Sequence, residues 1–179
     1  MATKTLKIGS KAPDFSLKAT NGNFYSIDSF KAKRAVIVMF SCNHCPYVQA
    51  YEKRIIEIQE RYAKYLQILA INSNDDKNYP EDSFDNMVER SKSHAFNFLY
   101  LRDETQDVAR TYDATHTPEI FLFNEARELV FHGKIDDNWQ DSKLVKSFYL
   151  LNAIEELLSG KPVSVPETFT IGCTIKWKN

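Results

Sequence analysis

Two cysteines stand three residues apart in the segment "FSCNHCPYV" (residues 40–48), with Asn43 and His44 between them. A pair of thiols can exchange electrons by joining in a disulfide, which requires Cα atoms about 4.4 to 6.8 Å apart. Residues i and i+3 in the first turn of a helix meet this requirement. The spacing therefore predicts that Cys42 and Cys45 form a redox-active pair.

The residues on either side of the pair predict a strand and a helix. The apolar run "AVIVMF" (35–40) has the length and the β-branched content of a buried strand. From Pro46 onward, apolar residues recur at helical spacing over about five turns. Proline is tolerated in the first turn of a helix, because its missing N–H has no partner to lose there. We therefore expect the pair at a strand-to-helix turn, with Cys42 near the helix N-cap.

This placement predicts different roles for the two thiols. Free N–H groups and the positive end of the helix dipole favour a thiolate, so Cys42 is the expected nucleophile. Lowering a cysteine pKa from about 8.5 to about 6.5 raises the thiolate fraction at pH 7 from roughly 3% to roughly 75%. Cys45, one turn further in, is the expected resolving thiol. A protonated His44 near the Cys42 sulfur would add to the effect, and the alternative is a solvent-facing His44 without a role.

Strands and helices alternate beyond this turn. "LQILAIN" (66–72) and "FNFLYL" (96–101) predict two further buried strands, with a helix through Phe84 and Met87 between them. Such alternation implies right-handed βαβ crossovers and an α/β sheet.

The second half of the chain has a different pattern. Residues 119–135 predict an antiparallel hairpin. Residues 142–160 predict a helix with Ser142 as N-cap and Gly160 as the stop signal. The remaining residues, 161–179, form a tail that contains prolines.

Length and composition limit the classes of protein. With 179 residues the chain suits one core, so we expect a single domain over 1–179 with its core at about 6–160. The net charge is −1, from 23 basic and 24 acidic residues, so neither nucleic acid nor a membrane is an expected partner. No apolar run suits a signal peptide or a membrane span, which predicts a cytoplasmic protein, or a periplasmic one if a leader was removed.

A second motif, "THTPE" (115–119), stands directly before the strand "IFLF". The ordered set of "GSKAPDFSL", "VIVMFSCNHCPYV", "TPEIFLF" and the closing helix resembles the AhpC/TSA-type thioredoxin-like family related to TlpA and ResA. The resemblance spans about residues 6–160. It implies a thioredoxin-like three-layer α/β/α fold with a central mixed sheet, an N-terminal extension and a C-terminal tail. It also implies thiol–disulfide oxidoreductase activity without a cofactor.

The resemblance assigns roles by motif position. Cys42 and Cys45 match the redox pair, and Pro118 matches the cis-proline that lies opposite it. Thr117 matches the residue whose backbone groups bind an extended substrate segment, a form of β-augmentation. From the residues alone, a Thr-Pro bond is more often trans.

Further contacts and partners follow from the same resemblance. Asn43 and His116 are expected substrate contacts, and the Asn43-His44 dipeptide is similar to those of oxidising and isomerising relatives such as DsbA and protein disulfide isomerase. The expected partners are a disulfide-containing protein or small molecule and a dithiol or reductase as electron donor. The expected assembly is a monomer or a weak homodimer.

Two other functions are weighed against this one. A peroxiredoxin-like thiol peroxidase needs Pro and Thr or Ser seven and three residues before the reactive cysteine. Cys42 has Ala35 and Met39 there, and Cys45 has Val38 and Cys42, which disfavours peroxidase chemistry.

The second alternative is a copper-binding, Sco-like metallochaperone with Cys42, Cys45 and His116 as ligands, since two thiolates and an imidazole suit copper. Sco-type proteins space their cysteines CxxxC rather than CxxC. Structural zinc is disfavoured because no second close pair of ligands follows.

Other polar residues remain open at this stage. Cys173 is either a small buried apolar residue or a thiol with a regulatory or second-step disulfide role. Acidic loops such as "NDD" are expected to be solvated. No acidic base for Cys45 stands in the strand "AVIVMF".

Overall fold

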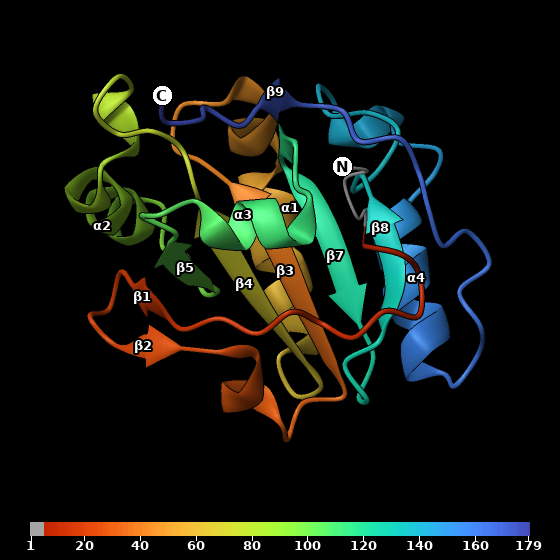
Figure 1. Ribbon diagram of the computed structural model, residues 1–179. Coiled ribbons are helices and arrows are strands. Elements are labelled where there is room, and N and C mark those ends of the chain that lie inside the picture. The colour runs from red at the N-terminus through yellow and green to blue at the C-terminus, as the bar shows by residue number, and fades with distance from the viewer. Residues whose placement is uncertain (1–5) are drawn as a thin grey trace.

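The computed structural model describes residues 6–179 (Figure 1), and residues 1–5 of the expected domain lie outside the described residues. A seven-stranded sheet in the order β2-β1-β5-β4-β3-β7-β8 forms the centre. Helices α1, α2 and α4 pack on one face, and α3 packs on the other. The fold is therefore the expected thioredoxin-like α/β/α sandwich with a mixed sheet.

The central strand β3 (Ala35–Ser41) is buried along its whole length. It pairs parallel with β4 and antiparallel with β7, and helices cover both of its faces, which explains its unbroken apolar sequence. The other strands of this sheet are β1 (Leu17–Ala19), β2 (Phe24–Tyr25), β4 (Leu66–Asn72), β5 (Leu99–Arg102), β7 (Glu119–Phe123) and β8 (Leu129–Gly133). A second, two-stranded sheet joins β6 (His116–Thr117) to β9 (Cys173–Thr174).

Helix α1 (Pro46–Tyr62) follows β3, as the apolar spacing predicted. The other α-helices are α2 (Phe84–Ser93), α3 (Asp107–Tyr112) and α4 (Tyr149–Leu158), and three 3₁₀-helices are η1 (Ile27–Phe30), η2 (Pro80–Asp82) and η3 (Ser142–Leu144). In the described part of the chain, none of these helices is long and apolar enough to cross a membrane.

The start predicted for the last helix is wrong. Ser142 begins only the short η3, after which Val145 is extended, and α4 begins at Tyr149. The Asp137 carboxylate accepts a hydrogen bond from the Lys146 N–H at 2.9 Å, which holds this segment outside the helix. Gly160 does follow the end of α4, with a φ of 73°.

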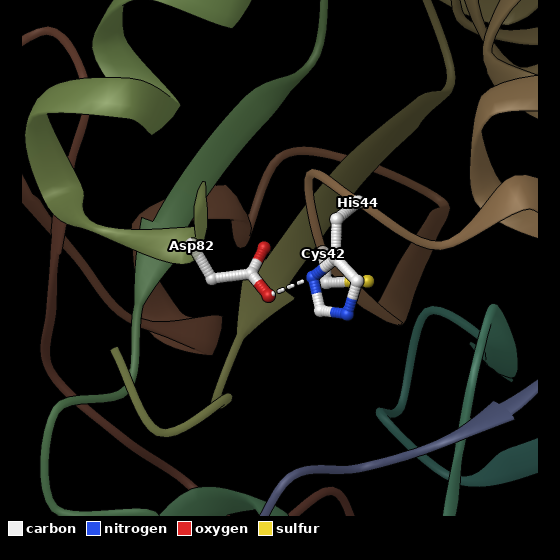
Figure 2. Close-up of side chains that lie close together, drawn as sticks. All are labelled: Cys42, His44 and Asp82. Carbon is white, nitrogen blue, oxygen red and sulfur yellow. Dashed lines mark hydrogen bonds and ion pairs between the residues drawn. The ribbon is translucent and has the colours of Figure 1, made fainter. Parts of the chain in front are cut away.

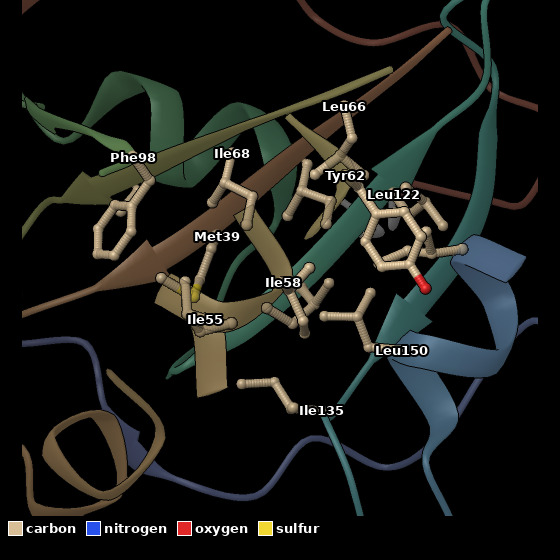
Figure 3. Close-up of a cluster of buried hydrophobic side chains, with 14 of the residues drawn as sticks. Met39, Ile55, Ile58, Tyr62, Leu66, Ile68, Phe98, Leu122, Ile135 and Leu150 are labelled. Carbon is tan, nitrogen blue, oxygen red and sulfur yellow. The ribbon is translucent and has the colours of Figure 1, made fainter. Parts of the chain in front are cut away.

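Two apolar clusters fill the space between the layers. On one face, α1 and α4 pack side chains such as Ile55 and Leu150 against the sheet (Figure 3). On the other face, Tyr112 of α3 packs edge-on against Phe121. The Tyr112 hydroxyl donates a hydrogen bond to the Pro13 carbonyl at 2.7 Å, which attaches the N-terminal extension to the domain.

We predict that Ile37→Ala lowers the free energy of unfolding by about 2 to 5 kcal/mol, because it leaves a cavity in β3 where the sheet is covered on both faces. Urea denaturation measures this as a lower midpoint with an unchanged slope. Ile8→Ala is the matched control: Ile8 is 39% exposed, and its loss should cost under about 1 kcal/mol. Equal losses in the two variants would contradict the assignment of Ile37 to the core.

Candidate active site

The turn between β3 and α1 carries both cysteines of the pair. Cys45 has extended backbone angles, φ −72° and ψ 121°, and is the N-cap residue of α1. Pro46 is the physical cause, since a residue before proline avoids helical geometry. Cys42, predicted to lie near the N-cap, stands three residues before it. The N-cap position belongs to Cys45.

Both sulfurs face the segment that contains Pro118. The Thr117–Pro118 peptide bond is cis. The Cys42 sulfur lies 3.5 Å from the Thr117 hydroxyl oxygen, and the Cys45 thiol donates a hydrogen bond to the Thr117 carbonyl at 3.3 Å. Both cysteines are free thiols and are almost completely buried. The four predicted residues thus form one compact site.

The two thiols have opposite electrostatic environments. The pKa of Cys45 is lowered to about 4, chiefly because the Cys42 thiol donates a hydrogen bond to its sulfur. The Cys173 thiol and the backbone N–H groups of Val48 and Cys173 add to this lowering, against the effect of burial. When Cys45 ionises, its sulfur accepts these hydrogen bonds in place of its own bond to Thr117.

The pKa of Cys42 is raised, because its proton is held in the hydrogen bond to Cys45, because it is buried, and because the Asp82 carboxylate lies nearby. These influences favour the thiolate on Cys45, at the positive end of the α1 dipole, whereas the sequence predicted it on Cys42.

A buried carboxylate stands beside the pair. Asp82 of η2 is fully buried and accepts hydrogen bonds from the Asn43 N–H at 2.6 Å and from the side-chain amides of Asn74 and Asn72 at 2.9 and 3.2 Å. It also bonds the Nδ1 atom of His44 at 2.5 Å (Figure 2). Four partners therefore fix its position.

Sequence reasoning missed Asp82, because it treated the acidic loops as solvated. The useful signal was position: the polar segment 73–82 follows the carboxyl end of β4, which is parallel to β3. Carboxyl ends of neighbouring parallel strands meet at one edge of a sheet, so this segment had to lie beside Cys42.

The His44 ring is oriented by two contacts. Its Nδ1 atom faces Asp82, and the ring stacks on Tyr79 with centroids 5.6 Å apart. A protonated His44 is therefore paired with a carboxylate and adds no net positive charge beside the Cys42 sulfur. This differs from both sequence-based alternatives, the isolated positive charge and the solvent-facing ring.

Asn43 does not take the position expected of a substrate contact, and His116 contacts its neighbour in the chain. Asn43 is buried, donates to the Glu81 carbonyl at 2.8 Å and accepts from the Tyr100 hydroxyl at 2.9 Å, so it holds the turn in place. His116 bonds the Thr115 hydroxyl at 2.8 Å through Nδ1.

The expected copper ligands are not brought together. Among the described residues, the ligand atoms close enough to share a metal ion belong to Cys42, His44 and Asp82, within 4.8 Å of one another. His116 is not part of this group. The Asp82 carboxylate already accepts four hydrogen bonds, so a cation would have to displace them.

The backbone edge expected to receive substrate is occupied by the chain itself. Strand β9 pairs antiparallel with β6, with Cys173 opposite Thr117. Cys173 packs against the small cluster of Cys42, Cys45 and Val48. The third cysteine of the chain thus lies beside the pair at the start of α1.

The electrostatics of the pair give a prediction for the reduced protein. The 240 nm absorbance of a thiolate should persist as pH falls from about 7 to about 5, and should disappear with a midpoint near the Cys45 pKa of about 4. Cys42→Ala should raise this midpoint by about one to two pH units, because it removes a hydrogen bond to a charged acceptor. Cys42→Ser, which keeps a donor, is the matched control and should stay closer to the wild type. A Cys45→Ser protein that retains the low-pH transition would refute the assignment.

Solved structures with this architecture come from several bacteria. An uncharacterized conserved protein from Geobacillus kaustophilus is 36% identical, with a TM-score of 0.91 over 98% of this chain and 94% of that one. A hypothetical protein from Sinorhizobium meliloti 1021 is 35% identical, with a TM-score of 0.91 over 98% and 97% of the two chains. The thioredoxin domain of a thiol-disulfide oxidoreductase from Bacteroides vulgatus is 19% identical, with a TM-score of 0.61 over 72% and 89%, and shares the fold.

No curated protein matches the chain. The family model described as the AhpC/TSA family matches residues 8–132, which include β3, the cysteine turn and the Thr117–Pro118 segment. This match covers well over half of the chain. The protein belongs to the AhpC/TSA family.

Proposed function

We propose that the protein is a thiol–disulfide oxidoreductase in which Cys45 is the nucleophile and Cys42 is the resolving thiol. The observation that carries the proposal is that both sulfurs meet at the Thr117 segment beside the cis-proline: the Cys42 sulfur lies 3.5 Å from the Thr117 hydroxyl and the Cys45 sulfur 3.3 Å from its carbonyl. The lowered pKa of Cys45 favours it as the thiolate and leaves Cys42 as the second thiol. These are the two groups that a dithiol–disulfide exchange requires.

In the reducing direction, the Cys45 thiolate attacks one sulfur of a substrate disulfide. A mixed disulfide forms, and the first substrate sulfur leaves as a thiolate. Cys42 then loses its proton to that thiolate and attacks the Cys45 sulfur, which expels the second substrate thiolate; a proton from water neutralises it. The substrate gains two electrons, and the Cys42–Cys45 pair loses two as it becomes a disulfide.

A dithiol or a reductase restores the reduced pair by the reverse exchange. The Asp82 carboxylate contributes by disfavouring negative charge on Cys42, so the resolving thiol remains protonated until the mixed disulfide has formed. Substrate enters by replacing β9 at the backbone edge of Thr117, which breaks the pairing of β9 with β6. A disulfide-containing protein segment or a small disulfide suits this edge.

Two single-cysteine proteins test the proposed roles. Cys42→Ser/Cys173→Ser retains only Cys45, and Cys45→Ser/Cys173→Ser retains only Cys42. Both are treated near pH 6 with an aromatic disulfide, dithiobis(nitrobenzoate). The protein that retains Cys45 should form a stable mixed disulfide at least about tenfold faster than the protein that retains Cys42, because a larger fraction of its thiol is ionised. Mass spectrometry identifies the adduct, and release of the coloured thiolate measures the rate.

The wild-type protein provides the second readout. Reaction at Cys42 and Cys45 should release two equivalents of coloured thiolate. The first leaves when Cys45 forms the mixed disulfide, and the second leaves when Cys42 attacks that disulfide. Faster reaction of the Cys42 protein would reverse the two roles. Failure of both single-cysteine proteins to form any adduct, with intact folds by circular dichroism, would overturn the proposed function.

A further inference from the structure

The C-terminal tail crosses the cysteine site and is held on both sides of Cys173 (Figure 1). Before Cys173, the Thr168 N–H donates to the His132 carbonyl at 3.0 Å. After it, the Ile175 N–H donates to the Thr115 carbonyl at 2.9 Å, and the Ile175 side chain is buried in the apolar core. These anchors fix the position of the Cys173 backbone over the site.

The tail approaches the Thr117 segment as closely as a backbone can. A Cβ atom on Gly172 would lie 2.1 Å from the Thr117 carbonyl oxygen, so only glycine fits there. Cys173 is next in the chain and is directly opposite Thr117 in the strand pairing. The same Thr117 carbonyl lies 3.3 Å from the Cys45 sulfur. Cys173 therefore stands where the cysteine of an extended substrate segment would stand.

The Cys173 sulfur is in contact with one sulfur of the pair, that of Cys45. Its thiol interacts with the Cys45 sulfur, and burial together with this interaction raises its pKa to about 11. Cys173 is partly exposed, whereas Cys42 and Cys45 are buried. The third sulfur thus lies between the buried pair and the solvent.

We propose, on the basis of the proposed function, that Cys173 is a third redox cysteine that forms a disulfide with Cys45. In the oxidised pair, the Cys173 thiolate attacks the Cys45 sulfur of the Cys42–Cys45 disulfide. The Cys45–Cys173 bond forms, the Cys42–Cys45 bond breaks, and Cys42 leaves as a thiolate that takes up the proton lost by Cys173. No net oxidation occurs, so no further oxidant is needed.

The exchange has two consequences. It transfers the disulfide from a buried pair to a sulfur that external thiols can reach more easily. It also fixes β9 to the site, so the Thr117 edge stays closed to substrate until the disulfide is reduced. The tail acts as an internal substrate of the cysteine pair.

Peptide mapping of the oxidised full-length protein tests the proposal. The protein is oxidised with glutathione disulfide at low concentration, its free thiols are alkylated, and it is digested with trypsin without reduction. Cys42 and Cys45 fall in peptide 35–53, and Cys173 falls in peptide 147–176, because Lys161 precedes proline. We expect the two peptides to be joined, with the alkyl group on Cys42.

The possible outcomes separate the two proposals. Only a Cys42–Cys45 disulfide, with alkylated Cys173, would overturn the third-cysteine proposal and leave the proposed function standing. Absence of both disulfides, together with no reaction of the single-cysteine proteins, would overturn the proposed function. The Cys42→Ser protein should form the Cys45–Cys173 disulfide within one molecule, whereas Cys45→Ser should retain both thiols under the same conditions.

A matched pair of tail variants tests the role of strand pairing. Gly172→Val places a side chain against the Thr117 carbonyl and should reduce the yield of joined peptides by about tenfold or more, because it lowers the effective concentration of Cys173 at Cys45. Thr174→Val changes an exposed residue of the same strand and should match the wild type. Equal yields of joined peptides in the two variants would show that the pairing of β9 does not hold Cys173 close to Cys45.

Discussion

The contacts that hold the Cys42 and Cys45 sulfurs against Thr117 are the interactions on which the chemistry of this protein depends. They keep two buried thiols together, and the surroundings favour the proton on Cys42 and the negative charge on Cys45. The backbone explains this preference. Pro46 keeps Cys45 out of helical geometry and makes it the N-cap, so the dipole of α1 acts directly on Cys45. The two cysteines of one turn therefore have different electrostatic environments.

The surrounding polar residues contribute to this difference. Asp82 is a buried carboxylate with hydrogen-bond donors from the cysteine turn, from β4 and from the loop that follows β4. A buried charge costs little only when it is so fully paired. Its negative charge lies on the Cys42 side of the pair, and it orients His44 as well. The carboxylate therefore fixes the shape of the turn and favours charge on the other sulfur.

The C-terminal tail completes the site. A thioredoxin-like sheet leaves the short segment before the cis-proline with free backbone groups, and β9 pairs with them here. The pairing buries the cysteine pair and places a third thiol beside it. A substrate that binds at this edge must compete with a segment of the same chain, whose effective concentration is high.

The local patterns of the sequence predicted most of the fold. The apolar run of β3, the helical spacing of α1, the alternation of strands and helices and the hairpin of β7 and β8 were all visible in the residues. Such patterns are reliable because burial on one or both faces of an element directly selects its residues. The predicted start of α4 was wrong, since the Asp137 carboxylate bonds the Lys146 N–H nine residues further on and Val145 is extended.

The sequence by itself determined that two thiols stand three residues apart after a buried strand, and that Thr117 and Pro118 precede another strand. Only the tertiary structure decided the surroundings of each sulfur, because these depend on the exact N-cap and on Asp82, 40 residues after Cys42. The position of Cys173 beside the pair has the same origin. Spacing along the chain reports neighbours within an element, whereas the third sulfur and the buried carboxylate reach the site through the packing of separate elements.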